Sequence, residues 1–253
     1  MSFRLIIRIL FGLLVFLGVI FQSPPNYVDL GSNHLGVFNP GHILGTDRLG
    51  RDNFSLFAYG SLSTILVVLP ARILTVLFAF LFASLSQFSN QLTESFLSAL
   101  SSVFLAIPSL LVALVVITFL PEWKLSVIIA IVVSDWALVY ETILSKMREL
   151  KNSGYIVSSK LMGASSLQIV YFHYFPALKS LFAFLFLSGL PAVVMTTALF
   201  SYLGVQVTLG DFGPGLGEQI SFSKDYFDQS PVSVLLPMLA ILALVYSLGN
   251  DSK

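Results

Sequence analysis

Charged residues are scarce in this 253-residue sequence, where Asp, Glu, Lys and Arg together make up only 10%. Soluble globular proteins carry about 25%, so this chain lacks the charge needed to cover a water-facing surface. Its 13 basic and 13 acidic side chains balance, which excludes a nucleic-acid-binding protein. Cysteine is absent, which excludes disulfides, thiolate metal sites and cysteine nucleophiles. Hydrophobic residues make up 56% of the whole chain and include 23 Phe, which indicates an all-α integral membrane protein.

Long apolar runs predict how often the chain crosses the bilayer, because a spanning helix needs about 20 mostly apolar residues. We expect a single transmembrane domain over residues 1–253. The first run follows Arg4 and Arg8 and could be a signal peptide, but no small-x-small cleavage site follows it, which favours an uncleaved anchor. The six expected helices cover about 3–22, 57–85, 98–120, 125–146, 179–203 and 231–249.

Lysine and arginine predict the orientation, since cytoplasmic loops carry an excess of them. With the N-terminus inside, eight basic residues lie on the cytoplasmic side and four on the outer side, so both termini are expected in the cytoplasm. The connections are then an outer loop over 22–54, a cytoplasmic loop over 146–177 and a second outer loop over 205–230.

The sequence contains none of the catalytic or nucleotide-binding motifs considered below, so we expect no enzyme. No H-x-x-x-H, H-E-x-x-H or G-x-S-x-G pattern is present, and the glycine-rich stretch 210–217 lacks the Lys-Ser/Thr of a phosphate-binding loop. We therefore expect no catalytic residue, no metal and no cofactor, and any energy source other than an ion gradient must come from another chain.

Arg72 and Asp135 are the two charges expected near the middle of membrane helices. Burying a charge there costs at least about 2.5–3.5 kcal/mol on insertion scales. The two could form an ion or proton relay, could pair structurally between the second and fourth helices, or could face a watery cavity. The residues alone leave these interpretations open.

The cytoplasmic loop reads as two helices on either side of Gly163. The first is expected over Arg148 to Met162, and the second over Leu167 to Phe175, capped by Ser165 or Ser166 and stopped by Pro176. Gly163 would take a positive φ at the junction. Such an element could dock a soluble partner through apolar side chains, or could simply be an amphipathic helix at the membrane surface. The apolar candidates for a buried contact are Leu167, Ile169 and Val170.

Three motifs resemble the permease subunits of ABC importers. Residues 155–165 with His173-Tyr174-Phe175-Pro176 resemble the EAA loop of that family. Residues 44–52 resemble the G-T-D-x-x-G-R-D signature of dipeptide and oligopeptide permeases, and residues 201–206 resemble the segment after their fifth helix. The Glu-Ala-Ala core of the loop is replaced by Val157-Ser158-Ser159, and an arginine often found after the family's Trp is Glu141 here.

The resemblance implies the fold of a type I importer permease in the bacterial inner membrane. The implied partners are a second homologous permease, two cytoplasmic ATPase subunits, an extracytoplasmic substrate-binding protein and the lipid bilayer, with no nucleic acid. Di- and oligopeptides are the implied cargo, with nickel chelates as an alternative in the same family. Two rivals remain: an ion-coupled secondary transporter that uses Arg72 and Asp135, and a membrane scaffold without transport.

The resemblance also implies two groups of site residues. The group expected to dock the ATPases and couple them to transport is Tyr155, Lys160, Gly163, Ala164, Ser165, Leu167, Ile169, Val170 and Pro176. The group expected at the outer mouth is Gly45, Thr46, Asp47, Gly50, Arg51 and Asp52.

Overall fold

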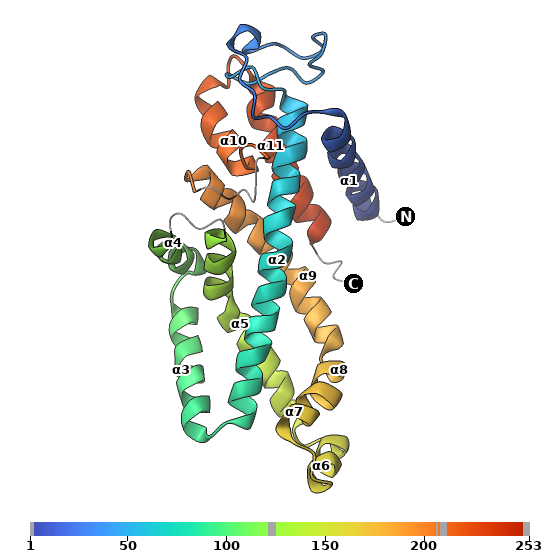
Figure 1. Ribbon diagram of the computed structural model, residues 1–253, viewed down its shortest axis with the longest axis vertical. Coiled ribbons are helices and arrows are strands. Elements are labelled where there is room, and N and C mark those ends of the chain that lie inside the picture. Colours follow the sequence, from blue (N-terminus) through green and yellow to red (C-terminus); the bar gives the residue numbers. More distant parts are fainter. Residues whose placement is uncertain (1–2, 121–124, 206, 208–211, 250–253) are drawn as a thin grey trace. The chain divides into compact units, whose positions relative to one another are not determined.

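A computed structural model describes residues 3–120, 125–205, 207 and 212–249 of the chain, and Figure 1 shows the order of its elements. The described residues form helices joined by loops, with isolated β-bridges only between Asn39 and His42 and between Thr46 and Asp52. The long helices are α1 (Phe3–Phe21), α2 (Asn53–Phe88), α3 (Gln91–Ala106), α4 (Ser109–Phe119), α5 (Ser126–Leu150), α9 (Lys179–Tyr202) and α11 (Pro231–Leu248). The short elements are η1 (Leu30–Ser32), α6 (Gly154–Leu161), α7 (Ser166–Ile169), η2 (Val170–Tyr174), α8 (Phe175–Ala177), α10 (Leu216–Ser223) and η3 (Lys224–Tyr226).

Five of these helices are long and apolar enough to cross a membrane, and the bent pair of α3 and α4 brings the number to six if it counts as one span. The all-α fold with about six spans is therefore confirmed. These helices expose many large apolar side chains, among them Phe16, Leu81 and Leu242. Apolar surface of this kind is compatible with a lipid solvent and not with water.

The third expected helix, 98–120, is wrong as a single element. The chain instead forms α3 and α4, which meet at an angle of 102°. Ile107 adopts an extended conformation at φ −102° and ψ 134°, because the ring of the following Pro108 disfavours the helical region. Pro108 then becomes the N-terminal boundary of α4, where its missing N–H costs nothing.

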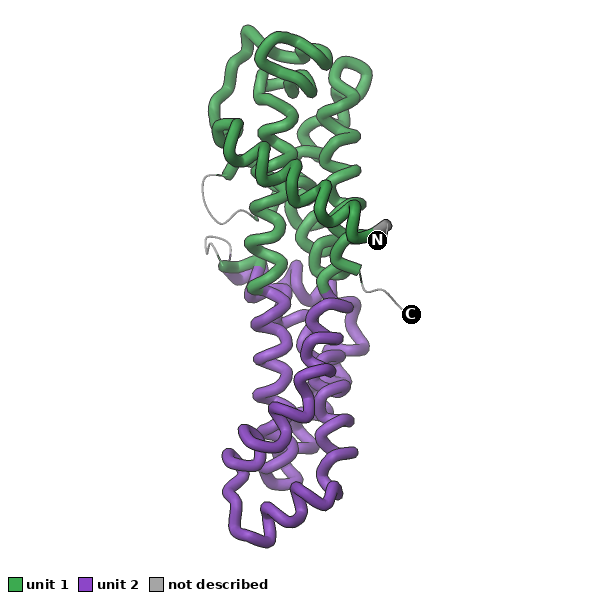
Figure 2. Tube along the Cα trace, turned by 90° about the vertical axis from the view of Figure 1, so that its right-hand side faces the viewer, with its two compact units in different colours: residues 1–70, 122–127, 190–253 green, residues 71–121, 128–189 purple. Residues whose placement is uncertain are grey.

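The chain divides into two compact units, which Figure 2 colours separately. Unit 1 contains Met1–Pro70, Glu122–Val127 and Leu190–Lys253, and unit 2 contains Ala71–Pro121 and Ile128–Gly189. Helices α2, α5 and α9 contribute residues to both units. The expectation of one transmembrane domain stays a prediction.

The core of unit 2 is centred on Trp136. Its ring makes edge contacts with Phe82 and Phe104, at centroid distances of 5.2 and 5.5 Å. Tyr140, one turn along α5, is fully buried and donates its hydroxyl to Ser86 on α2 over 3.1 Å. Aromatic packing and a satisfied buried hydroxyl thus fix α5 against α2 and α3.

In unit 1, α1 packs against α2 and α11. Phe11 and Phe57 meet edge to face at 5.6 Å, and Arg8 donates to the carbonyls of Ser247 and Gly249 at the end of α11. A cation at a helix C-terminus pairs with carbonyls that lack an intrahelical partner and with the negative end of the helix dipole. The N-terminal helix is therefore held in the fold by specific polar contacts as well as by apolar area.

Candidate functional site

The connection between α5 and α9 (residues 151–178) contains the helix–glycine–helix element. We expected one helix over 148–162, but α5 ends at Leu150 and α6 begins only at Gly154. Gly163 ends α6 at φ +86°, a conformation that glycine reaches without steric cost. Its N–H donates to Lys160 O and the N–H of Ala164 donates to Ser159 O, both over 3.0 Å. This pair of bonds is a Schellman motif, and it satisfies the last carbonyls of α6.

The element has two arms, of which α6 is the first and α7 with η2 (residues 166–174) is the second. Ser165 begins the second arm through a capping box. Its hydroxyl accepts from the N–H of Gln168 over 3.3 Å, and the Gln168 side chain accepts from the N–H of Ser165 over 2.8 Å. We expected a helix that stops at Pro176, and this is wrong. A π-helical turn, η2, follows α7, the N–H of Phe175 donates to Val170 O, and Pro176 lies in the first turn of α8. Proline is tolerated there because first-turn N–H groups have no helical acceptor.

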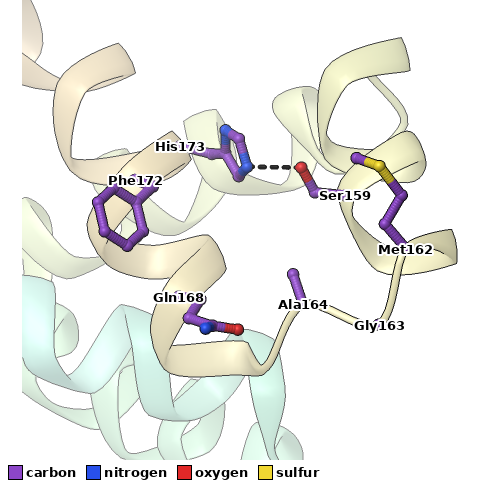
Figure 3. A pocket seen from close by; sticks show the side chains of 7 residues that line it. All are labelled: Ser159, Met162, Gly163, Ala164, Gln168, Phe172 and His173. Carbon is purple, nitrogen blue, oxygen red and sulfur yellow. Dashed lines mark hydrogen bonds between the residues drawn. The ribbon is translucent and has the colours of Figure 1, made fainter.

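A pocket of about 450 Å³ opens between the two arms (Figure 3). At one side the Ser159 hydroxyl and His173 Nε2 form a hydrogen bond of 2.7 Å, and the Tyr155 ring lies 5.7 Å from that of His173. This contact joins α6 to η2 and sets the opening between the arms. The residues lining the pocket are Ser159, Met162, Gly163, Ala164, Gln168, Phe172 and His173.

The two arms bury one set of apolar side chains and expose another. Ile156, Ile169 and Tyr174 lie in the core of unit 2, where burial raises the pKa of the Tyr174 hydroxyl. Leu161 and Leu167 are 83% and 82% exposed. The expectation that Ile169 contacts a partner is therefore wrong, because it is 2% exposed and packs within its own chain. Val170 is half-buried, and Tyr155, Lys160, Ser165 and Pro176 are exposed.

The loop before α2 brings the six residues of the second motif together. Asp47 is 1% exposed, and its carboxylate accepts from the backbone N–H groups of Leu49 and Arg51 and from Arg51 Nε, at 2.8–2.9 Å. A second Arg51 nitrogen lies 2.6 Å from Asp47. Gly45 and Gly50 have φ values of +70° and +73°, and a Cβ at either position would overlap backbone atoms of residues 35 or 29.

Asp52 and Thr46 complete this loop. Asp52 accepts from the N–H of Ser55 and contacts His42 Nδ1, both over 2.9 Å, so it caps the start of α2. The Thr46 hydroxyl donates to Ser32 O and accepts from the N–H of Leu35. Both carboxylates of the motif are thus fully engaged within the loop.

Arg72 and Asp135 lie in contact between α2 and α5. Arg72 Nη1 donates to Asp135 Oδ2 over 2.7 Å, and Arg72 Nε donates to Leu185 O on α9 over 3.0 Å. A Cβ at Gly189 would overlap the guanidinium. The contact has the geometry of the structural pair that we considered, and it joins three helices of unit 2. Neither the acceptor carbonyl of Leu185 on α9 nor the contact of the guanidinium with Gly189 could be predicted from the sequence.

Two other groups carried no clear signal in the sequence. The Ser159–His173 hydrogen bond was not expected, although His173 stands in the His-x-x-Pro motif. Arg48, inside the second motif, was counted among the outer basic residues but was not expected to have a role of its own. Groups of three or more His, Asp or Glu side chains that could hold a metal are not found in the described residues.

Comparisons with known proteins show which sequences this chain is similar to. Residues 75–250 match the family described as "Binding-protein-dependent transport system inner membrane component". The chain is 29% identical to the oligopeptide transport system permease protein OppC of Bacillus subtilis, over 66% of this chain and 54% of that one. It is 30% identical to the di/tripeptide transport system permease protein DppC of Pseudomonas aeruginosa, over 90% and 72%. It is 24% identical to the metal-staphylopine import system permease protein CntC of Staphylococcus aureus, over 87% and 75%.

Proposed function

Because the chain belongs to the family of binding-protein-dependent transport system inner membrane components, we propose that it is the permease subunit of an ATP-driven importer of di- and oligopeptides. It is a multi-pass inner membrane protein. The observation that carries the proposal is the element at Gly163, whose two capped arms hold exposed apolar side chains outside the spans.

The chemistry of this element suits the docking of a soluble ATPase. The buried residues Ile156 and Ile169 anchor the arms, and the exposed residues Leu161, Met162 and Leu167 offer apolar area. Covering such a side chain fully contributes about 1.5–3 kcal/mol. Because the Schellman motif and the capping box fix the angle between the arms, a force applied to them passes to α5 and α9. Closure of the ATPases on nucleotide would then move the spans.

The proposed assembly has four other subunits. A second homologous permease would share the pathway, one ATPase would dock on each permease, and a substrate-binding protein would deliver cargo on the outer side. Lipid would cover the remaining apolar faces. The excess of Lys and Arg in the loops supports cytoplasmic termini, and in that orientation residues 151–178 would face the ATPases.

The relatives' names support peptides as cargo, since two of them are named for oligopeptide and for di/tripeptide transport. A metal chelate is the second candidate, because CntC is named for metal-staphylopine import and matches 87% of this chain. The ion-coupled alternative has less support, because Arg72 and Asp135 already neutralise each other.

Uptake in cells that express the chain with its partner subunits tests the proposal. We expect uptake of a radiolabelled dipeptide that needs both the ATPases and the binding protein, is blocked by vanadate and persists with a protonophore. An excess of unlabelled dipeptide should compete, whereas a nickel chelate should not. Uptake that survives without the ATPases, or that collapses with the protonophore alone, contradicts the proposal.

A further inference from the structure

Arg48 has no acidic partner in the part of the chain that the structure describes. Its side chain makes neither an ion pair nor a hydrogen bond there, and Nε is buried without an acceptor. The other loop charges nearby are engaged: Asp47 pairs with Arg51, and Asp52 contacts His42. A half-buried guanidinium left without an anion is unusual, because a buried donor without an acceptor is costly.

Two aromatic rings hold this guanidinium. Its carbon lies 5.4 Å from the ring centre of Phe222 and 5.4 Å from that of Tyr226, at the end of α10 and in η3. Attraction between a cation and the faces of aromatic rings fixes the plane of the guanidinium. Arg48 is half-buried, and of its side-chain nitrogens only Nε is found buried without a partner, so the two terminal amino groups are the ones that can bind a carboxylate end-on.

Contacts of His34 help to hold the Tyr226 ring in place. His34 packs against Tyr226 with ring centres 5.6 Å apart, and its Nδ1 lies 2.7 Å from the Ser230 hydroxyl. His34 adopts φ +53°, a left-handed conformation that is unfavourable for a residue other than glycine. Backbone strain of this kind persists where the surrounding structure over-determines it and is frequent at binding sites.

We propose that Arg48, with Phe222 and Tyr226, is a docking site for a carboxylate side chain on the substrate-binding protein. The inference rests on the proposed function, which supplies that partner on the outer side. Arginine and aromatic residues dominate the energetic centres of protein interfaces. Phe222 is 37% exposed and Phe227 45%, so apolar area surrounds the cation.

The charges around Arg48 favour a protein over an anionic lipid. Asp225 and Asp228 are exposed acids on the segment that carries Tyr226, so the surface around Arg48 is of mixed sign. Lys224 is not part of it, because its ammonium donates to the Tyr202 hydroxyl over 3.4 Å and lies 5.4 Å from the centre of that ring. A surface of mixed sign fits a partner of complementary mixed charge, and its acids repel a membrane rich in anionic headgroups.

The test measures the affinity of the binding protein for the assembled transporter in phosphatidylcholine nanodiscs. Arg48→Gln should weaken binding about tenfold or more, mainly through a faster off-rate. Arg48→Lys should also weaken it, because an ammonium cannot reproduce the planar grip. The matched control Lys224→Gln removes one positive charge from the same segment and should change the affinity less than twofold. Arg48→Glu should abolish binding. Replacing the surface carboxylates of the binding protein by lysine, one at a time, should yield one variant that restores binding to Arg48→Glu.

Three outcomes would overturn the inference. These are an unchanged affinity in Arg48→Gln, an equal loss in Lys224→Gln, or a loss that appears only when phosphatidylglycerol is added. Thermal unfolding of each variant separates a misfolded loop from a lost contact, and Arg48→Lys keeps the charge if Arg48→Gln fails to assemble. If the wild-type transporter takes up peptide with its binding protein and Arg48→Gln binds normally, only this inference fails. If the wild-type complex binds no such protein, the proposed function fails first.

Discussion

Arg72 Nη1 donates to Asp135 Oδ2 over 2.7 Å, and the same guanidinium donates to the carbonyl of Leu185 on a third helix. The arginine side chain is 4% exposed and that of the aspartate 31%. Removing one partner of a buried pair leaves an uncompensated charge, which is far costlier than losing both. The contact therefore holds α2, α5 and α9 in unit 2 only while both charges are present.

Asp135→Asn should strongly reduce the folded yield, by a cost of up to about 3 kcal/mol given that the aspartate is partly exposed. The double variant Asp135→Asn, Arg72→Gln should recover part of that loss. Fluorescence-detected size-exclusion chromatography of all four proteins completes the cycle. If the double variant loses as much folded yield as the two single variants together, Arg72 and Asp135 do not stabilise the protein as a pair.

Gly189→Ala tests the close packing of the Arg72 guanidinium against α9. A Cβ there overlaps Arg72, so the side chain must shift away from Leu185 O, at a cost of about 1–3 kcal/mol typical of overpacking. Gly12→Ala is the matched control, since no atom lies within 4 Å of a Cβ at that helical position. Thermal unfolding in detergent should show a lower Tm for Gly189→Ala and not for Gly12→Ala. In the Arg72→Gln background, Gly189→Ala should lower the Tm by less. A decrease of the same size there would show that the overlap with Arg72 is not its cause.

The spans were predictable from the sequence because each needs a long apolar run, which composition alone reveals. The break at Pro108 was not, because the run stays apolar on both sides of it and hydropathy is blind to the backbone angles of Ile107. Gly163 was predictable in conformation, since few residues other than glycine end a helix at positive φ.

The wrong assignment of Ile169 at the candidate site comes from the rotation of a short helix. The assignment of Ile169 and Leu167 to one surface needs the helix phase, and α7 begins at Ser166 and passes into a π-helical turn after only four residues. Tertiary packing selects Ile169 for the core, and no period can be read from so short an element. Likewise the acceptor at Leu185 is a backbone carbonyl, and any residue supplies one.

Glu218, in the first turn of α10, gives a prediction about pH. Burial raises the pKa of its carboxyl, while the backbone at Gly215 and the charge of Arg51 lower it in part. A raised folded-state pKa means that the folded protein binds its proton more tightly, so the free energy of unfolding falls as pH rises from the unfolded pKa of about 4.3 through the folded value. Glu218→Gln cannot ionise and should melt at a higher Tm than the wild type at pH 7.

The two melting temperatures should converge below about pH 4, where the carboxyl is protonated in both states. Glu149→Gln is the control, because Glu149 is largely exposed and pairs with Lys146 at the surface. It should show no comparable gain at pH 7. A Glu218→Gln protein that is less stable than the wild type at neutral pH would show that the carboxylate is favoured by its surroundings and that burial is not the dominant effect.

Leu167 and Gly163 test the element between α5 and α9 directly. Leu167→Asp changes a side chain that is 82% exposed, so folding should be unaffected while co-purification of the ATPase falls at least tenfold. Ile169→Asp should instead destroy the fold, since it places a charge in the core of unit 2.

Gly163→Val forces a β-branched residue to φ +86°, which costs of order 1–3 kcal/mol and should change the angle between the arms. Gly154→Ala, where a Cβ meets nothing and φ is not positive, is its control.

We expect Gly163→Val to insert in the membrane normally but to lose ATPase association, or to hydrolyse ATP without uptake. The second result is the more informative, because an element that still binds but no longer holds a fixed angle would uncouple the two activities. Measuring the ratio of uptake to hydrolysis in each variant distinguishes a docking contact from a coupling joint. Normal association and a normal ratio in both Leu167→Asp and Gly163→Val would mean that the ATPase acts on another part of the chain, and that the capped arms only anchor α9 to unit 2.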